Sequence, residues 1–150
     1  MSTTPTPAGD DPARLYRDTV MRHAREPVGY NKPISVTHQN EQFNPLCGDR
    51  ITLMLEMTGE EVLDAAFEGE SCAICKASAS MLCKLAPGQT RTQLDGYREW
   101  LNSALAGSEQ PTGGTPLAAL LGVRAYPSRI KCAVLPWEAL KAAFGSDLPD

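Results

Sequence analysis

Apolar and polar residues alternate in the middle of this chain. Apolar residues occupy every second position from 51 to 57, a spacing typical of a half-buried β-strand. The turn signal Thr-Gly-Glu at 58–60 precedes the run 62–67, which predicts the returning strand of a hairpin. The short β-branched segment 34–38 predicts an edge strand. Together these segments predict a three-stranded antiparallel sheet.

The apolar spacing becomes helical on both sides of the predicted strands. Three predicted helices cover residues 13–26, 71–86 and 92–105. A last helix is expected from about Ser128, interrupted or kinked near Pro136 because proline cannot donate the helical hydrogen bond. This order predicts an α+β fold, with helices packed on one side of the sheet.

The chain has 150 residues, a length that suits one domain, and we expect that domain over residues 11–145. Residues 1–10 are rich in Ser, Thr, Pro and Gly and are expected to form a disordered lead. The stretch 107–116 is a loop by composition, 117–121 a short helical turn and 146–150 a frayed tail.

Charge and hydropathy exclude several classes of function. The net charge of −4 and the pI near 5.2 argue against a nucleic-acid surface, which needs a basic face. No apolar run approaches the roughly 20 residues of a membrane span. The N-terminus lacks the pattern of a secretory signal, so a cytoplasmic location is expected. The five cysteines cannot all pair within the chain, and in a reducing compartment such thiols more often bind metal or react.

Three cysteines and one aspartate form a candidate metal site: Cys47, Asp49, Cys72 and Cys132. Three thiolates and a carboxylate suit a borderline-soft divalent ion such as Zn²⁺. Cys47 and Asp49 are expected in the loop before the second strand, where the intervening glycine lets both side chains converge. Spacing alone leaves three uses open: a structural metal, a cluster scaffold or a sulfur carrier.

The other two predicted ligands lie at helices. Cys72 is expected at the start of a helix, with Ser71 able to cap it. Cys132 is expected in the opening turns of the last helix, where Arg129 and Lys131 supply positive charge.

The remaining cysteines are expected to lie outside this ligand set. Cys83 follows Cys72 by eleven residues, about 16 Å along a helix, so it is expected to be a core thiol. Cys75 follows Cys72 in a Cys-x-x-Cys spacing, which suggests a redox dithiol or half of a zinc knuckle. Because antiparallel hairpins, not a βαβ unit, precede it, Cys75 is expected to be inert or a spare ligand.

Four segments resemble the SufU branch of the IscU-like sulfur-trafficking proteins. They are LYRDTVMRHAREP, NPLCGDRITL, AAFEGESCAICKASASML and YPSRIKCAVLPWEALKAA, and the resemblance covers about residues 13–145. The chain has Lys131 where the IscU branch has histidine, lacks the LPPVK segment of that branch, and carries the long insert of the SufU branch. It departs from the SufU pattern at Ser71 and Cys75.

The resemblance implies a zinc-dependent sulfurtransferase that works with a SufS-type, pyridoxal-phosphate-dependent cysteine desulfurase. Zinc would be held by Cys47, Asp49, Cys72 and Cys132, and a histidine of the desulfurase would displace one thiolate, which then accepts persulfide sulfur. We expect Cys47 to be the acceptor because it lies on a loop, whereas Cys72 and Cys132 are anchored by helices.

The resemblance also implies a downstream Suf cluster-assembly scaffold as the recipient of the sulfur. Arg129 and Lys131 are expected to offset the negative charge of the site, and Arg129 also to contact the desulfurase. The rival functions are an IscU-like scaffold that builds an iron–sulfur cluster on the same ligands, and a zinc-stabilised binding module without catalysis.

Overall fold

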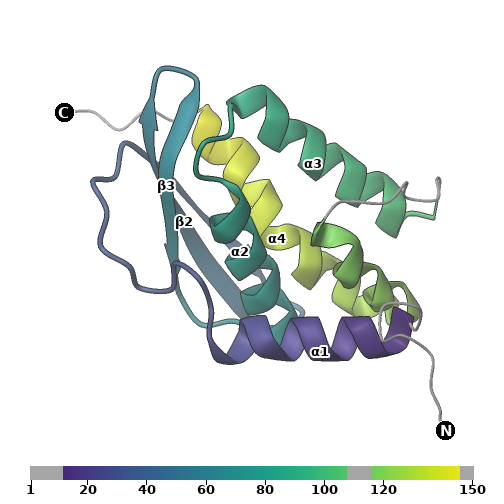
Figure 1. Cartoon of the computed structure of the whole chain (residues 1–150). Coiled ribbons are helices and arrows are strands. Elements are labelled where there is room, and N and C mark those ends of the chain that lie inside the picture. The colour runs from purple at the N-terminus through teal and green to yellow at the C-terminus, as the bar shows by residue number, and fades with distance from the viewer. Residues whose placement is uncertain (1–11, 108–115, 146–150) are drawn as a thin grey trace, which may run out of the picture.

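The computed structural model describes residues 12–107 and 116–145. In these residues a three-stranded antiparallel sheet is covered on one face by helices, which confirms the predicted α+β fold (Figure 1). The predicted disordered lead, the frayed tail and most of the predicted loop at 107–116 lie outside the described residues.

The sheet has the order β1 (His38–Asn44), β2 (Asp49–Thr58) and β3 (Glu61–Glu68). The central strand β2 buries the alternate residues 51, 53, 55 and 57 and leaves their neighbours half-buried or exposed. This burial confirms the period-two prediction. The register of β2 with β3 shifts between Glu56 and Met57, a bulge that lies near the hairpin turn.

The position of β1 differs from the prediction. The sequence predicted an edge strand at 34–38, whereas β1 begins at His38 and continues through the polar run to Asn44. Strand β1 pairs along its whole length with β2, so backbone hydrogen bonds hold a segment with little apolar content. Only His38 and Asn44 of this strand are buried, which is why no hydrophobic alternation marked it.

Five helical elements accompany the sheet in the described residues: α1 (Pro12–Arg25), α2 (Ala73–Leu85), α3 (Arg91–Leu105), the 3₁₀ helix η2 (Pro116–Ala125) and α4 (Pro127–Phe144). Helices α2 and α4 pack on the sheet, while α1 packs across α2 and η2, and α3 packs against α4 and η2 (Figure 1). None of the described helices is both long and apolar enough to cross a membrane.

Helix α4 passes through Pro136 without ending, so of the expected interruption or kink the interruption is wrong, and the kink stays a prediction. Proline at 136 leaves the carbonyl of Cys132 without its usual helical donor. The neighbours Leu135 and Trp137 are buried in the core, and this packing holds the helix across the missing bond. The region predicted as a short turn at 117–121 is a longer 3₁₀ helix.

One buried hydrogen bond fixes α2 relative to α4 near the predicted metal ligands. Ser78 Oγ donates to the carbonyl of Ala133 at 2.5 Å, and the serine is fully buried. Ala133 directly follows Cys132, and α2 begins directly after Cys72. This bond therefore connects the backbone next to Cys132 with the helix that follows Cys72.

Candidate metal centre

The four predicted ligands come from four different segments that meet at one end of the sheet. Cys47 lies in the β1–β2 hairpin loop, Asp49 is the first residue of β2, Cys72 immediately precedes α2, and Cys132 lies in α4. Asp49 is therefore part of the strand and not of the loop before it, because it pairs with Asn44 across the hairpin.

Asn44 organises the loop that carries Cys47. Its carbonyl oxygen accepts from the N–H of Cys47 at 3.3 Å and of Gly48 at 2.8 Å, and its Oδ1 accepts from the N–H of Leu46 at 3.1 Å. Gly48 has a φ of +74°, a conformation that favours glycine, and this lets the chain turn directly into Asp49. Sequence reasoning missed Asn44, although the Asn-Pro pair at 44–45 is a turn signal that pointed to it.

Asp49 links the loop to the start of α2. Its side chain is 1% exposed, and Oδ1 accepts from the N–H of Cys72 at 2.7 Å. Its second oxygen, Oδ2, lies 3.6 Å from Cys72 Sγ. One buried carboxylate therefore positions the backbone of Cys72 and also contacts its sulfur.

Cys72 itself is the N-cap of α2, so the expected cap at Ser71 is wrong. Cys72 has extended backbone angles, and its Sγ accepts from the N–H of Cys75 at 3.5 Å. The helix begins only at Ala73, which places Ser71 one position too early to cap it.

The donor atoms of Cys47, Asp49 and Cys132 lie within 4.8 Å of one another. The two sulfurs of Cys47 and Cys132 are 3.3 Å apart. Donors around a tetrahedral zinc, with Zn–S bonds of about 2.3 Å, are about 3.8 Å apart, so this spacing fits a single ion. Cys72 Sγ adjoins Asp49 but is not within 4.8 Å of all three of these donors.

The chemistry of the donor set also fits a cation. Burial, followed by hydrogen bonds to Asp49 and Cys47, raises the pKa of the Cys132 thiol. Burial beside a carboxylate and two further thiols disfavours the thiolate, whereas a bound divalent ion would favour it. The three thiols and the carboxylate therefore match the ligand types that zinc takes.

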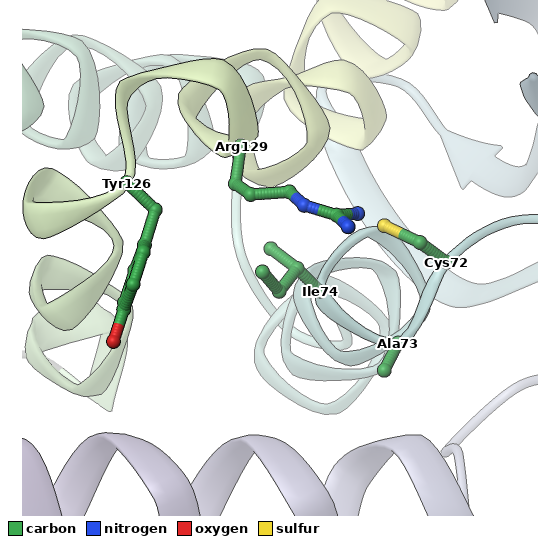
Figure 2. Close-up of a pocket in the computed structure, with 5 residues that line it drawn as sticks. All are labelled: Cys72, Ala73, Ile74, Tyr126 and Arg129. Atoms are coloured by element: carbon green, nitrogen blue, oxygen red, sulfur yellow. The ribbon is translucent and has the colours of Figure 1, made fainter. Parts of the chain in front are cut away.

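A pocket of about 460 Å³ opens beside Cys72 and is lined by Cys72, Ala73, Ile74, Tyr126 and Arg129. Figure 2 shows the guanidinium group of Arg129 pointing toward the sulfur of Cys72. The charge on Cys72 and a hydrogen bond to Cys132 raise the pKa of Arg129. This places Arg129 beside the predicted ligands, as expected from the sequence, while the pocket walls at Ile74 and Tyr126 carried no sequence signal.

Lys131 is less directly placed. It is exposed, whereas the next residue, Cys132, is buried. Successive residues of a helix point about 100° apart, so the Lys131 side chain leaves the helix away from the sulfur of Cys132. Arg129 lies beside the predicted ligands, whereas the role of Lys131 in offsetting their charge stays a prediction.

The remaining cysteines are both buried in α2. Cys83 is 2% exposed and lies in the hydrophobic core, which confirms the core prediction. Cys75 is fully buried, and burial, followed by the negative charge of Asp49, raises the pKa of its thiol. Cys75 is not among the three gathered donors, although its backbone N–H reaches Cys72.

Comparison with known sequences gives a consistent set of relatives. The family profile described as the NifU-like N terminal domain matches residues 15–96. The zinc-dependent sulfurtransferase SufU of Bacillus subtilis is 37% identical over 131 residues, which cover 85% of this chain and 87% of that protein. The iron-sulfur cluster assembly scaffold protein IscU of Streptococcus pyogenes is 32% identical over 133 residues, which cover 86% of this chain and 82% of that protein.

Solved structures show the same architecture. A NifU-like protein (N-terminal) from Brucella abortus superposes with a TM-score of 0.80 at 22% identity, covering 87% of this chain and 92% of that one. A putative iron-sulfur cluster assembly scaffold protein for the SUF system from Fervidobacterium islandicum superposes with a TM-score of 0.73 at 27% identity. The superposition covers 86% of this chain and 96% of that one. At 22% identity, the similarity to the Brucella abortus protein shows a shared fold alone.

Proposed function

This chain belongs to the NifU-like N-terminal domain family, and from that membership we propose that it is a zinc-dependent sulfurtransferase of iron–sulfur cluster assembly. It would accept persulfide sulfur from a SufS-type cysteine desulfurase and pass it to a downstream cluster-assembly scaffold. The family membership confirms the resemblance inferred from the sequence motifs. The observation that carries the proposal is the gathering of Cys47, Asp49 and Cys132, with Cys72 adjoining Asp49.

The residues that would hold zinc are Cys47, Asp49, Cys72 and Cys132. When bound, zinc would keep the thiols deprotonated near neutral pH while limiting their reactivity. Hydrogen bonds within the protein position the ligands: Asn44 accepts bonds that shape the loop of Cys47, and Asp49 accepts a bond from the backbone at the start of α2.

Cys47 is the proposed sulfur acceptor. It is half-buried on the hairpin loop, next to Leu46, which is 81% exposed, whereas Cys132 is fully buried in α4. A loop residue can move toward a partner at lower cost than one packed in a helix. Cys47 is therefore the thiol best placed to leave the site.

The transfer step is an exchange between sulfur atoms. The Cys47 thiolate attacks the outer sulfur of the desulfurase persulfide, and a new S–S bond forms on Cys47. The S–S bond in the desulfurase breaks, and its cysteine leaves as a thiolate. No net oxidation or reduction occurs, so no further reagent is needed. Arg129 would stabilise the negative sulfur atoms that gather during this exchange.

The test is to locate the transferred sulfur. The full chain is incubated with the desulfurase and cysteine, and persulfide-bearing peptides are identified by mass spectrometry. We expect the extra sulfur on Cys47, its loss in Cys47→Ser, and no change in Cys83→Ser, a buried thiol outside the site. Sulfur found only on Cys75 or Cys83 would contradict the assignment of Cys47.

The second candidate is an IscU-like scaffold, favoured by the similarity to the Streptococcus pyogenes scaffold protein. The same four residues would then hold an iron–sulfur cluster. Purified protein distinguishes the two, since a cluster gives a brown chromophore and a zinc protein is colourless. Desulfurase turnover stimulated in a Cys47-dependent way would exclude a binding module without catalysis.

A further inference from the structure

We propose that Cys72 and Cys75 form a redox-active dithiol, which a low-molecular-weight disulfide converts into an intrachain disulfide. The sequence pattern alone disfavours such a dithiol, because no βαβ unit precedes the pair. The structure shows that the pair has a different geometric basis, namely the first turn of α2.

The two residues occupy the N-cap and third positions of α2, which face each other. The Cys72 sulfur already accepts from the backbone N–H of Cys75 at 3.5 Å. Cβ of Cys75 is two bonds from that nitrogen, so the Cys75 side chain starts close to the Cys72 sulfur. The same two positions of α3 contact each other through Thr90 and Gln93, which form a reciprocal capping box.

This geometry also suits the dimensions of a disulfide. Residues three apart on a helix have Cβ atoms about 5–6 Å apart, and the extended backbone of the N-cap residue leaves its side chain free to adjust. A disulfide needs Cβ atoms at about 3.5–4.5 Å, so the first turn of α2 has to tighten for the bond to form.

The two thiols differ in access, which sets the order of reaction. Cys72 is half-buried and lines the pocket of about 460 Å³, so a small reagent reaches it from solvent (Figure 2). Cys75 is fully buried behind it and is shielded from the same reagent. Arg129 at the pocket favours a reagent that carries carboxylates, such as oxidised glutathione.

The reaction balances in two exchange steps. The Cys72 sulfur attacks the small disulfide, forms a mixed disulfide and releases one small thiol. The Cys75 sulfur then attacks Cys72, forms the intrachain bond and releases the second thiol. The protein loses two electrons and two protons, and one small disulfide becomes two small thiols.

The consequence for the site rests on the proposed function. Cys72 is a proposed zinc ligand, and a sulfur in a disulfide does not bind zinc as a thiolate. Oxidation would leave only Cys47, Asp49 and Cys132 as donors. The dithiol would therefore oppose metal binding, and zinc would in turn protect Cys72 from oxidation.

Cys132 is a competing partner, because its side chain contacts both Cys47 and Cys72, and a Cys72–Cys132 disulfide in place of Cys72–Cys75 would overturn the proposal. The sulfurs of Cys47 and Cys132 are 3.3 Å apart, so this pair competes for oxidation in the metal-free chain. The variant Cys47→Ser removes that pair and leaves Cys72 and Cys75 unchanged. In this variant the proposal still requires the disulfide within α2.

The experiment treats the full chain, freed of metal by a chelator, with oxidised glutathione, blocks free thiols and maps disulfides by mass spectrometry. We expect a Cys72–Cys75 disulfide in the wild type and in Cys47→Ser. In Cys75→Ser we expect its loss and a persistent mixed disulfide at Cys72. Cys83→Ser serves as the matched control in α2 and should react as the wild type does.

The outcomes separate this proposal from the proposed function, because the mapping uses no desulfurase and no metal. Disulfides found only between Cys47 and Cys132, or a stable mixed disulfide at Cys72 in the wild type, would overturn the dithiol. Failure of sulfur transfer to Cys47 would leave the mapping result unaffected.

Discussion

Asp49 offers the sharpest test of how the site is built, because its carboxylate has two separable roles. One is structural: Oδ1 accepts from the N–H of Cys72 at 2.7 Å while the side chain is 1% exposed. The other is the proposed role as the single oxygen ligand. Asp49→Ala removes both roles, whereas Asp49→Asn keeps an oxygen acceptor and removes the negative charge.

The magnitude follows from the hydrogen bond. A bond to a charged acceptor contributes about 1.5–3 kcal/mol, so Asp49→Ala should lower the free energy of unfolding of the metal-free protein by about 2 kcal/mol. For a chain of this size that corresponds to a fall in Tm of roughly 4–8 °C. Asp49→Asn retains a neutral hydrogen bond and should lose only about 1 kcal/mol. Both variants should bind zinc more weakly, because both lose the anionic ligand.

The assay is urea unfolding of reduced, chelator-treated protein, followed by zinc competition against a chromophoric chelator. Asp64→Ala is the matched control, since Asp64 is a strand aspartate whose ion pair with Lys32 is half-exposed and should contribute at most about 1 kcal/mol. Equal stability of Asp49→Ala and the wild type would refute the anchoring of Cys72. Unchanged zinc affinity in Asp49→Asn would refute the ligand role.

Two further predictions concern the supports of the site and the response to pH. Gly69 precedes the site with a φ of +118°, and an added Cβ would overlap the carbonyl oxygen of Arg50, so Gly69→Ala should cost about 3 kcal/mol by denaturant unfolding. Gly88→Ala has a similar positive φ but open space around it, and it should cost clearly less. Burial and nearby positive charges lower the pKa of His23, whose Nδ1 lies 2.6 Å from Ser80 Oγ. The unfolded chain then binds the proton more tightly, so stability should fall as pH drops below about 6.5, and His23→Gln should flatten that slope.

Much of the fold could be predicted because its elements carry local signals. The alternation in β2 reflects one buried face, and the burial of residues 51 to 57 follows it. Helices α2 and α3 have helix-forming residues, and their predicted ranges differ from the observed ones by one or two residues. The four candidate metal ligands could be predicted from their residue types, since cysteine thiolates and an aspartate carboxylate are groups that bind a divalent ion such as zinc.

The first strand could not be predicted in this way. The residues from His38 to Asn44 are almost all polar and become a strand only because β2 offers them backbone partners. Pairing energy of this kind comes from the neighbouring strand of the hairpin, and the apolar pattern of the segment itself does not contain it. The same holds for α4, which continues through Pro136 because packing replaces the missing hydrogen bond.

The sequence by itself determined which chemical groups this protein has for its function. They are the four candidate metal ligands, the basic residue Arg129 and a further thiol at Cys75. Only the tertiary structure decided their arrangement. It gathered Cys47, Asp49 and Cys132, left Cys72 at the pocket, and buried Cys75 behind it. Residue types are local properties of the chain, whereas distances between segments and exposure to solvent arise only when the sheet and helices pack together.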